Sequence, residues 1–274
     1  MKNLKFYCVT NKEVNFIKND TYNLAWVGTD QAPDGYIRCD YDDNIFFKEK
    51  FYSELTFHYW YWKNLLKLES DDCWIGFCQK RRYWAIKNSP LVVDLECINE
   101  YLLTEPKKEW ENYETLICNP ISVSGIKKIK LIKKGWRNIL KKPSLLLNNG
   151  HQDLKLHFDL HHGYGNLDRA IALLDNSEKY DFNEYVKSNH LFNPHIMFIA
   201  KKKIVNKWFS TLFPWLERCE NEFGFKNLKG YETTRLYAFL AERYLSFWFK
   251  KYTVYKEQPW MFIENKPKHS KVEK

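Results

Sequence analysis

The stretch Cys73–Trp84, CWIGFCQKRRYW, decides how this chain folds. Its first half is apolar and follows the turn pair Asp71-Asp72, a pattern typical of a buried strand. Its second half places Lys80, Arg81 and Arg82 directly after that strand. Ligands of open α/β sheets bind beyond the carboxyl ends of the strands, and arginine binds phosphate through paired hydrogen bonds. The stretch therefore predicts an anion site at the edge of an α/β sheet.

The alternative is a structural role for Arg81 and Arg82, in which the two guanidinium groups pair with acids of the same chain. Candidates for such pairing include Asp40, Asp42 and Asp43.

The remaining sequence predicts strands early and helices late. Strands are expected at 4–9 and 113–119, a strand or short buried segment at 195–203, and a helix or strand at 90–102. Helices are expected at 52–68 with Ser53 as N-cap, and at 153–174, 182–191, 205–223 and 232–249. Residues 22–47 look irregular because turn signals interrupt them. This order favours one domain over residues 1–250, with an α/β part at 1–125 and a helical part at 126–250.

The overall composition favours an anionic partner. The 274 residues carry a formal net charge of +9, and 45% of them are hydrophobic, which is enough for a core. No zinc finger, helix-turn-helix or RNA-binding signature occurs, so we expect no nucleic-acid partner. Seven cysteines without a C-x-x-C pair indicate reduced, buried thiols and a cytoplasmic location. No run approaches the roughly 20 apolar residues of a membrane-spanning helix.

Two basic segments stand apart from this pattern. Residues 126–142, IKKIKLIKKGWRNILKK, place isoleucines on one helical face among eight basic residues. This pattern predicts a helix packed on the protein surface or, alternatively, one that docks on an anionic membrane. Residues 264–274 lack periodicity and are predicted to form a disordered basic tail.

The segment 38–64 mixes aromatic residues with polar ones, as a nucleoside or sugar pocket does. The alternative is an aromatic helix that only forms core. The polar residues of this segment that could bind such a nucleoside or sugar are Asp40, Asp43, Asn44, Lys63 and Asn64, with Glu54 as a candidate catalytic carboxylate.

The segment HQDLKLHFDLHHGYGN, residues 151–166, is rich in histidine. His157 and His161 have the spacing of two metal ligands on a helix, but Phe158 stands where a zinc protease motif needs Glu, so no metal is expected here. Asp159, His161 and His162 are candidates for a general base. Structural roles for the same side chains are the alternative. Phosphate-loop, dinucleotide-fold and serine-hydrolase motifs are all missing from the sequence.

Several motifs resemble those of the bacterial DUF4422 glycosyltransferases. DDNIFFKEKFYSELTFHYWYWKN and IGFCQKRRYW are similar to the family's D-N-I-S, C-E-L-T-x-x-Y-W-x-W-K-N and G-L-C-H-Y-R-R-Y-F. HIMFIAKKKIVNKWFSTLFPWLERCE and RLYAFLAERYLSFWF resemble later family helices, so the likeness runs over about 4–250. It implies a GT-A-like fold in which the part at 1–125 binds a UDP-sugar donor and the part at 126–250 binds the acceptor. A furanose is one candidate for the donor sugar, and the acceptor is a growing capsule or lipopolysaccharide glycan, free or lipid-linked.

Two positions depart from the family pattern. Gln79 and Lys80 replace His-Tyr before the arginine pair, and Ser53 replaces Cys. We expect Gln79, Lys80, Arg81 and Arg82 to bind the donor diphosphate in place of the divalent metal that many GT-A enzymes use, so that neither Mn²⁺ nor Mg²⁺ is required. The resemblance implies an inverting hexosyltransferase at the inner face of the cytoplasmic membrane. The alternative is a non-catalytic nucleotide-sugar-binding or scaffold protein of the same assembly.

Overall fold

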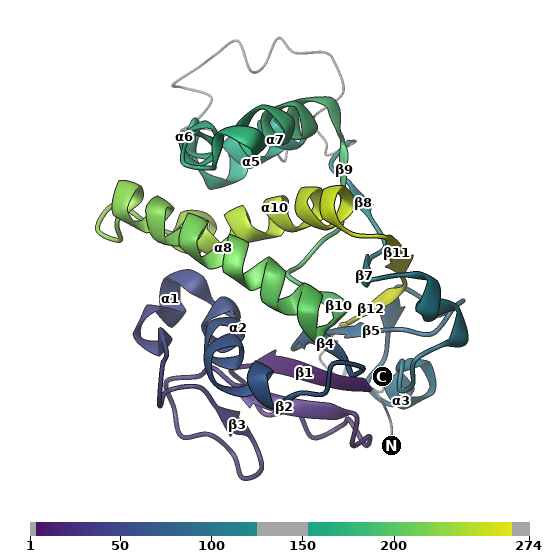
Figure 1. The fold of residues 1–274 in the computed structure, drawn as a ribbon. Helices are drawn as coiled ribbons and strands as arrows, with labels where there is room; N and C mark the ends of the chain where they lie inside the picture. Colours follow the sequence, from purple (N-terminus) through teal and green to yellow (C-terminus); the bar gives the residue numbers. More distant parts are fainter. Residues whose placement is uncertain (1–3, 125–152, 265–274) are drawn as a thin grey trace, which may run out of the picture.

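The computed structural model describes residues 4–124 and 153–264 and shows a mixed α/β fold (Figure 1). Its main sheet runs in the order β11-β7-β10-β4-β1-β2-β3, and β5, β6 and β12 extend it at one side. Strands β1 to β4 pair in parallel, whereas β10 is antiparallel to both neighbours. The strands of this sheet are β1 Leu4–Thr10, β2 Tyr22–Trp26, β3 Ile37–Arg38, β4 Trp74–Gln79, β5 Arg82–Trp84, β6 Val92–Val93, β7 Thr115–Cys118, β10 Phe198–Lys201, β11 Tyr255–Gln258 and β12 Trp260–Ile263. A separate pair joins β8 Ile121–Ser122 to β9 Leu191–Phe192.

Most of the helices cover one face of this sheet in two layers, whereas α3 packs against the other face (Figure 1). Helices α8 and α10 lie between the sheet and the group α5, α6 and α7. The helices are α1 Glu49–Tyr52, α2 Leu55–Trp60, α3 Ile98–Tyr101, α5 Leu154–His162, α6 Asn166–Ala172, α7 Asn176–Ser188, α8 Lys202–Phe223, α9 Tyr231–Thr234 and α10 Leu236–Tyr252. Short 3₁₀ turns at Phe46–Lys48, Leu66–Leu68 and Lys108–Asn112 and a π turn at Tyr61–Leu65 complete the described helical segments.

Alternation along the central strands builds two hydrophobic cores. Tyr7 of β1 and Phe77 of β4 face the helical side, whereas Phe6 and Cys8 face the other side. Gly76 of β4 is required by this packing, because a Cβ there would lie 2.3 Å from Cδ1 of Phe6. The tight core holds the carboxyl ends of β1 and β4 in fixed positions.

Most predicted elements are confirmed, and two expectations are wrong. The predicted irregular stretch 22–47 contains two parallel strands, β2 and β3, which are short and interrupted by turns. Ser53 does not begin a helix at 52. It ends α1 with a positive φ of 53°, and the chain restarts in α2 after this break.

The strands after residue 250 join the sheet, so the sheet draws on both predicted parts of the domain and on residues beyond the range 1–250. All seven cysteines are free, and all except Cys97 are buried, as the sequence predicts. Residues 126–142, and all but the first residue of the tail at 264–274, lie outside the described residues, so their predicted structures stay predictions.

Candidate functional site

A cavity of about 280 Å³ opens at the carboxyl ends of β1 and β4. Parallel strands end at one edge of a sheet, and that edge is where α/β proteins bind ligands. The residues that line the cavity come from these strand ends, from the α1–α2 break and from the start of α10: Val9, Thr10, Asn11, Val27, Glu49, Ser53, Glu54, Gln79, Lys80, Arg81, Arg82 and Arg235.

The arginine pair after β4 is placed by a tight hairpin. Gln79 pairs with Arg82, so Lys80 and Arg81 form the turn between β4 and β5. Arg81 has a left-handed φ of 71°, which is uncommon for a residue other than glycine. Its Nε donates to the carbonyl of Ile263 at 3.2 Å, and its guanidinium lies 4.5 Å from the ring centroid of Phe262. These contacts with β12 hold a cation at the edge of the sheet.

Lys80 is held on the opposite side of the cavity by the end of β1. Its amide donates to the carbonyl of Val9 at 3.1 Å, and its Nζ donates to Oδ1 of Asn11. Glu54 accepts a hydrogen bond from the side-chain amide of Gln79. This bond ties the start of α2 to the end of β4.

Positive charge exceeds negative charge in the cavity. Four cationic side chains line it, against the carboxylates of Glu49 and Glu54. Burial lowers the pKa of Lys80 from 10.5, and nearby Lys12, Arg235 and Arg81 lower it further, against the opposing effect of Glu49. Burial also raises the pKa of Glu49, which Arg235 and Lys80 oppose. An anion bound here would relieve the repulsion among the cations.

The structure brings five of the predicted site residues together in this cavity: Glu54, Gln79, Lys80, Arg81 and Arg82. It places Asp40 in a neighbouring cavity of about 290 Å³, which Trp26, Thr29, Asp30 and Arg38 also line. Arg38 is paired with Asp40 and lowers the pKa of that carboxyl. The two cavities adjoin at the end of β2, because Val27 lines the first and Trp26 lines the second.

Four other predicted donor-binding residues lie on a connected loop and helix outside both cavities. Asp43 accepts a hydrogen bond of 3.1 Å from the hydroxyl of Tyr59, and its carbonyl accepts one of 2.9 Å from Nδ2 of Asn64. Asn44 accepts from the amide of Phe46 at 3.0 Å. Lys63 lies 3.9 Å from the ring centroid of Trp62. These contacts fix the segment that precedes and follows α2.

The predicted general bases Asp159, His161 and His162 lie on α5, in the helical part, and the cavity lining does not include them. Asp159 accepts from Lys155 Nζ at 3.0 Å and from the amide of Gly165 at 3.1 Å. The ring of His162 stacks on Phe239 at 3.8 Å, and the rings of His161 and His157 lie 4.5 Å apart.

Among the lining residues that sequence reasoning missed, three carry a charge or a side-chain amide: Asn11, Glu49 and Arg235. Asn11 follows the first strand directly, so the rule of carboxyl ends could have found it. Glu49 lies within the segment 38–64, but no pattern separated it from the other acids there. Arg235 comes from far along the chain, and only the packing of α10 against α1 brings it to the cavity.

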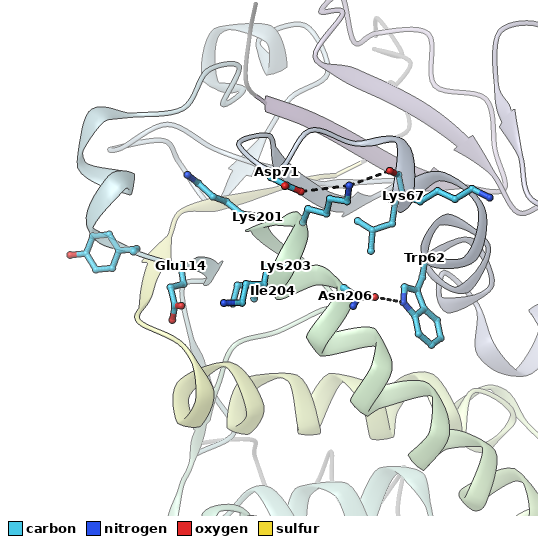
Figure 2. Close-up of a pocket in the computed structure, with 11 residues that line it drawn as sticks. Trp62, Lys67, Asp71, Glu114, Lys201, Lys203, Ile204 and Asn206 are labelled. Carbon is cyan, nitrogen blue, oxygen red and sulfur yellow. Dashed lines mark hydrogen bonds and ion pairs between the residues drawn. The ribbon is translucent and has the colours of Figure 1, made fainter.

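A larger pocket of about 780 Å³ lies at the opposite edge of the sheet, around the start of α8 (Figure 2). Lys201, one of its lining residues, pairs with Trp74 at the amino end of β4. Nζ of Lys202 donates to the carbonyl of Lys67 at 3.1 Å and lies 3.6 Å from Oδ1 of Asp71. Nε1 of Trp62 donates to Oδ1 of Asn206 at 2.9 Å, and Figure 2 shows these two side chains facing each other. Its position beyond the amino end of β4 separates it from the arginine cavity.

Residues 4–124 and 153–264 contain no group of three or more His, Cys, Asp or Glu side chains placed to hold a metal ion. The same ranges contain no helix that is both long and apolar enough to cross a membrane.

Two comparisons place this chain among known proteins. In the apo structure of the bifunctional glycosyltransferase WbbM, a region has the same fold, with a TM-score of 0.69 and 18% sequence identity. The match covers 96% of this chain and 45% of that one, so the chain spans about half the length of WbbM. This similarity confirms the predicted fold class. No curated protein matches the chain.

The family comparison covers nearly the whole chain. The model of the domain of unknown function DUF4422 matches residues 5–253, a range that includes the arginine hairpin, the α1–α2 break and all of α8 and α10. The chain therefore belongs to the DUF4422 family.

Proposed function

We propose that this protein is a glycosyltransferase that moves a sugar from a UDP-linked donor to a hydroxyl of a growing capsule or lipopolysaccharide glycan. The observation that carries the proposal is the convergence of Lys80, Arg81, Arg82 and Arg235 on one cavity at the carboxyl edge of the sheet. The diphosphate of a nucleotide-sugar donor is negatively charged, and arginine and lysine side chains form strong hydrogen bonds with phosphate oxygens. The fold shared with the bifunctional glycosyltransferase WbbM supports the same reaction class.

The two adjoining cavities suggest how the donor lies. We place the diphosphate among the cations beyond β1 and β4, and the nucleoside over the second cavity, beyond β2 and β3. In that second cavity, Asp30, Arg38 and Asp40 supply polar groups, and Trp26 supplies an apolar wall. This arrangement keeps Asp40 as a donor-binding residue while leaving Asp43, Asn44, Lys63 and Asn64 to shape the α2 segment.

We further propose that the fixed cations replace a divalent metal. As the bond between the anomeric carbon and the phosphate breaks, negative charge grows on the departing nucleotide. Guanidinium groups already held by Ile263 and Phe262 can stabilise that charge without reorganising. Asp40 is paired with Arg38, and Asp43 with Tyr59, so neither is arranged here as a metal ligand.

A melting-shift and turnover experiment tests this function. UDP should raise the melting temperature, an equal concentration of RNA oligonucleotide should not, and one UDP-sugar from a panel should release UDP in the presence of EDTA. Protection by UDP without turnover of any donor would favour a non-catalytic binding protein. Turnover that EDTA abolishes and Mn²⁺ restores would refute the metal-independent mechanism but keep the transferase.

A further inference from the structure

His195 occupies an unusual backbone conformation at the edge of the sheet where the arginines lie. It precedes β10, which runs antiparallel to β4, so the start of β10 lies toward the carboxyl end of β4. Its φ of 65° is left-handed, and strain of this kind persists only where the surroundings fix it. Here α10 fixes it: the amide of His195 donates to Oε1 of Glu242 at 2.6 Å, and the amide of Asn193 donates to Oγ of Ser246 at 2.8 Å.

An aromatic face of β12 connects His195 to the arginine pair. Trp260 and Phe262 are two residues apart on one strand and therefore face the same side of the sheet. The imidazole of His195 meets the ring of Trp260 edge-on, with centroids 4.7 Å apart. The guanidinium carbon of Arg82 lies 5.6 Å from the ring centroid of Phe262. The imidazole and the arginine thus rest on neighbouring rings.

Two buried polar atoms in this group lack a hydrogen-bond partner among the described residues. They are Nε2 of His195 and Nε of Arg82. Buried polar atoms in proteins are normally hydrogen-bonded, so such a pair marks a place for a polar group of a ligand. Arg82 lines the cavity assigned to the donor, and His195 is buried outside that lining.

We propose that His195 takes the proton from the acceptor hydroxyl during sugar transfer and that Glu242 positions its ring. This inference rests on the proposed function. The acceptor O–H bond breaks and its proton moves to Nε2, while the acceptor oxygen bonds to the anomeric carbon. The bond from that carbon to the donor phosphate breaks, and its electron pair leaves with the diphosphate. Nδ1 faces Oε1 of Glu242 at 3.9 Å, so the carboxylate favours the tautomer that leaves Nε2 free to accept.

The surroundings keep this base neutral at pH 7. Burial lowers the pKa of His195 below its usual 6.5, and the positive charge of Arg82 lowers it further. The other groups at this position are Glu242 of α10 and Cys118 of β7, whose thiol stays protonated because burial raises its pKa. A bound diphosphate offsets the charge of Arg82 and raises the pKa of His195. The acid limb of kcat should therefore lie at a higher pH than that of kcat/KM for the donor.

The discriminating variant is His195→Asn, because asparagine tolerates a left-handed backbone. We expect kcat to fall by about 10²-fold to 10⁴-fold, with an unchanged UDP melting shift and loss of the acid limb. Glu242→Gln should shift the acid limb and lower kcat less. The control His190→Gln changes an exposed histidine five residues earlier and should behave as wild type.

The carboxylates of the cavity are the rival bases, so Glu49→Gln and Glu54→Gln complete the set. If His195→Asn keeps kcat within a few-fold, or if either glutamate variant removes the acid limb instead, the assignment to His195 is overturned while the transferase stands. If wild type neither binds UDP nor turns over any donor, the proposed function itself fails. Added imidazole should partly restore transfer to His195→Ala, which a purely structural role for the ring would not allow.

Discussion

The side-chain amide of Gln79 donates to a carboxylate oxygen of Glu54, which joins the last residue of β4 to the residue that precedes α2. This bond fixes the orientation of the Gln79 side chain, and it engages one oxygen of the Glu54 carboxylate at the cavity. Gln79→Glu would put two carboxylates against each other there. We expect weaker UDP binding, measured by melting shifts with UDP. Gln79→His, the residue that the resembled family carries, should keep UDP binding.

The arginine pair should account for much of the donor affinity. Arg81→Ala and Arg82→Ala each remove a charge-assisted contact worth about 1.5–3 kcal/mol, or roughly 10-fold to 150-fold in the dissociation constant of UDP. Isothermal titration measures the loss. Arg169→Ala is the matched control, because Arg169 pairs with Glu222 on exposed helices away from the cavity. Normal UDP affinity in both variants would contradict the diphosphate site.

Binding of an anion should be coupled to protonation of Lys80. Its pKa is lowered in the empty cavity, and a nearby negative charge favours the ammonium form, so binding should raise this pKa. UDP binding should therefore take up protons at alkaline pH below 10.5, and its affinity should fall as pH rises through the lowered pKa. Calorimetry in buffers of different ionisation enthalpy reports the uptake, which Lys80→Met should abolish. Equal uptake in that variant would assign the effect to another group.

Acid sensitivity of the fold should depend on His58. Burial lowers the pKa of this histidine from 6.5 to about 3, because its ring lies 4.4 Å from that of Phe77 in the helical core. The unfolded chain therefore binds one more proton than the folded chain between these values. The free energy of unfolding should fall by about 1.4 kcal/mol per pH unit as pH drops from 6.5 toward 3. Urea titrations at several pH values should show a smaller slope for His58→Phe than for wild type.

The core position Gly76 should not tolerate a side chain. A Cβ would meet Cδ1 and Cε1 of Phe6 at 2.3 and 2.4 Å, so Gly76→Ala should cost about 1–3 kcal/mol of stability through overpacking. Chemical denaturation measures the change. Adding Phe6→Leu to Gly76→Ala should restore part of the lost stability. If the double variant is as unstable as Gly76→Ala alone, the cause is a backbone effect.

Much of this fold could be predicted from the sequence because local pattern and burial agree there. The apolar run before Gln79 forms β4, and the aromatic periodicity of 205–223 and 232–249 forms most of α8 and α10. The cavity was predicted in part, because Arg81 and Arg82 directly follow a recognisable strand. Both predictions depend only on residues that are close together in the sequence.

The errors come from features that only tertiary structure determines. The break at Ser53 interrupts a helical pattern that periodicity alone reads as continuous. The short strand β3 has two residues and gains its identity from pairing with β2. Arg235 and His195 reach the sheet edge through the packing of α10 and the turn before β10. Each begins a stretch that resembles the family, but nothing within those stretches assigns the residue to the edge of the sheet.

The hairpin that bears Arg81 is completed by a strand much later in the chain. Ile263 and Phe262 hold the guanidinium, and β12 can pair with β5 only after both have left the ribosome. A nascent chain paused before residue 255 would expose the free margins of β5 and β7. Chaperone demand should therefore persist until residues 255–263 have emerged, and shortening the protein to residue 250 should yield a species that aggregates.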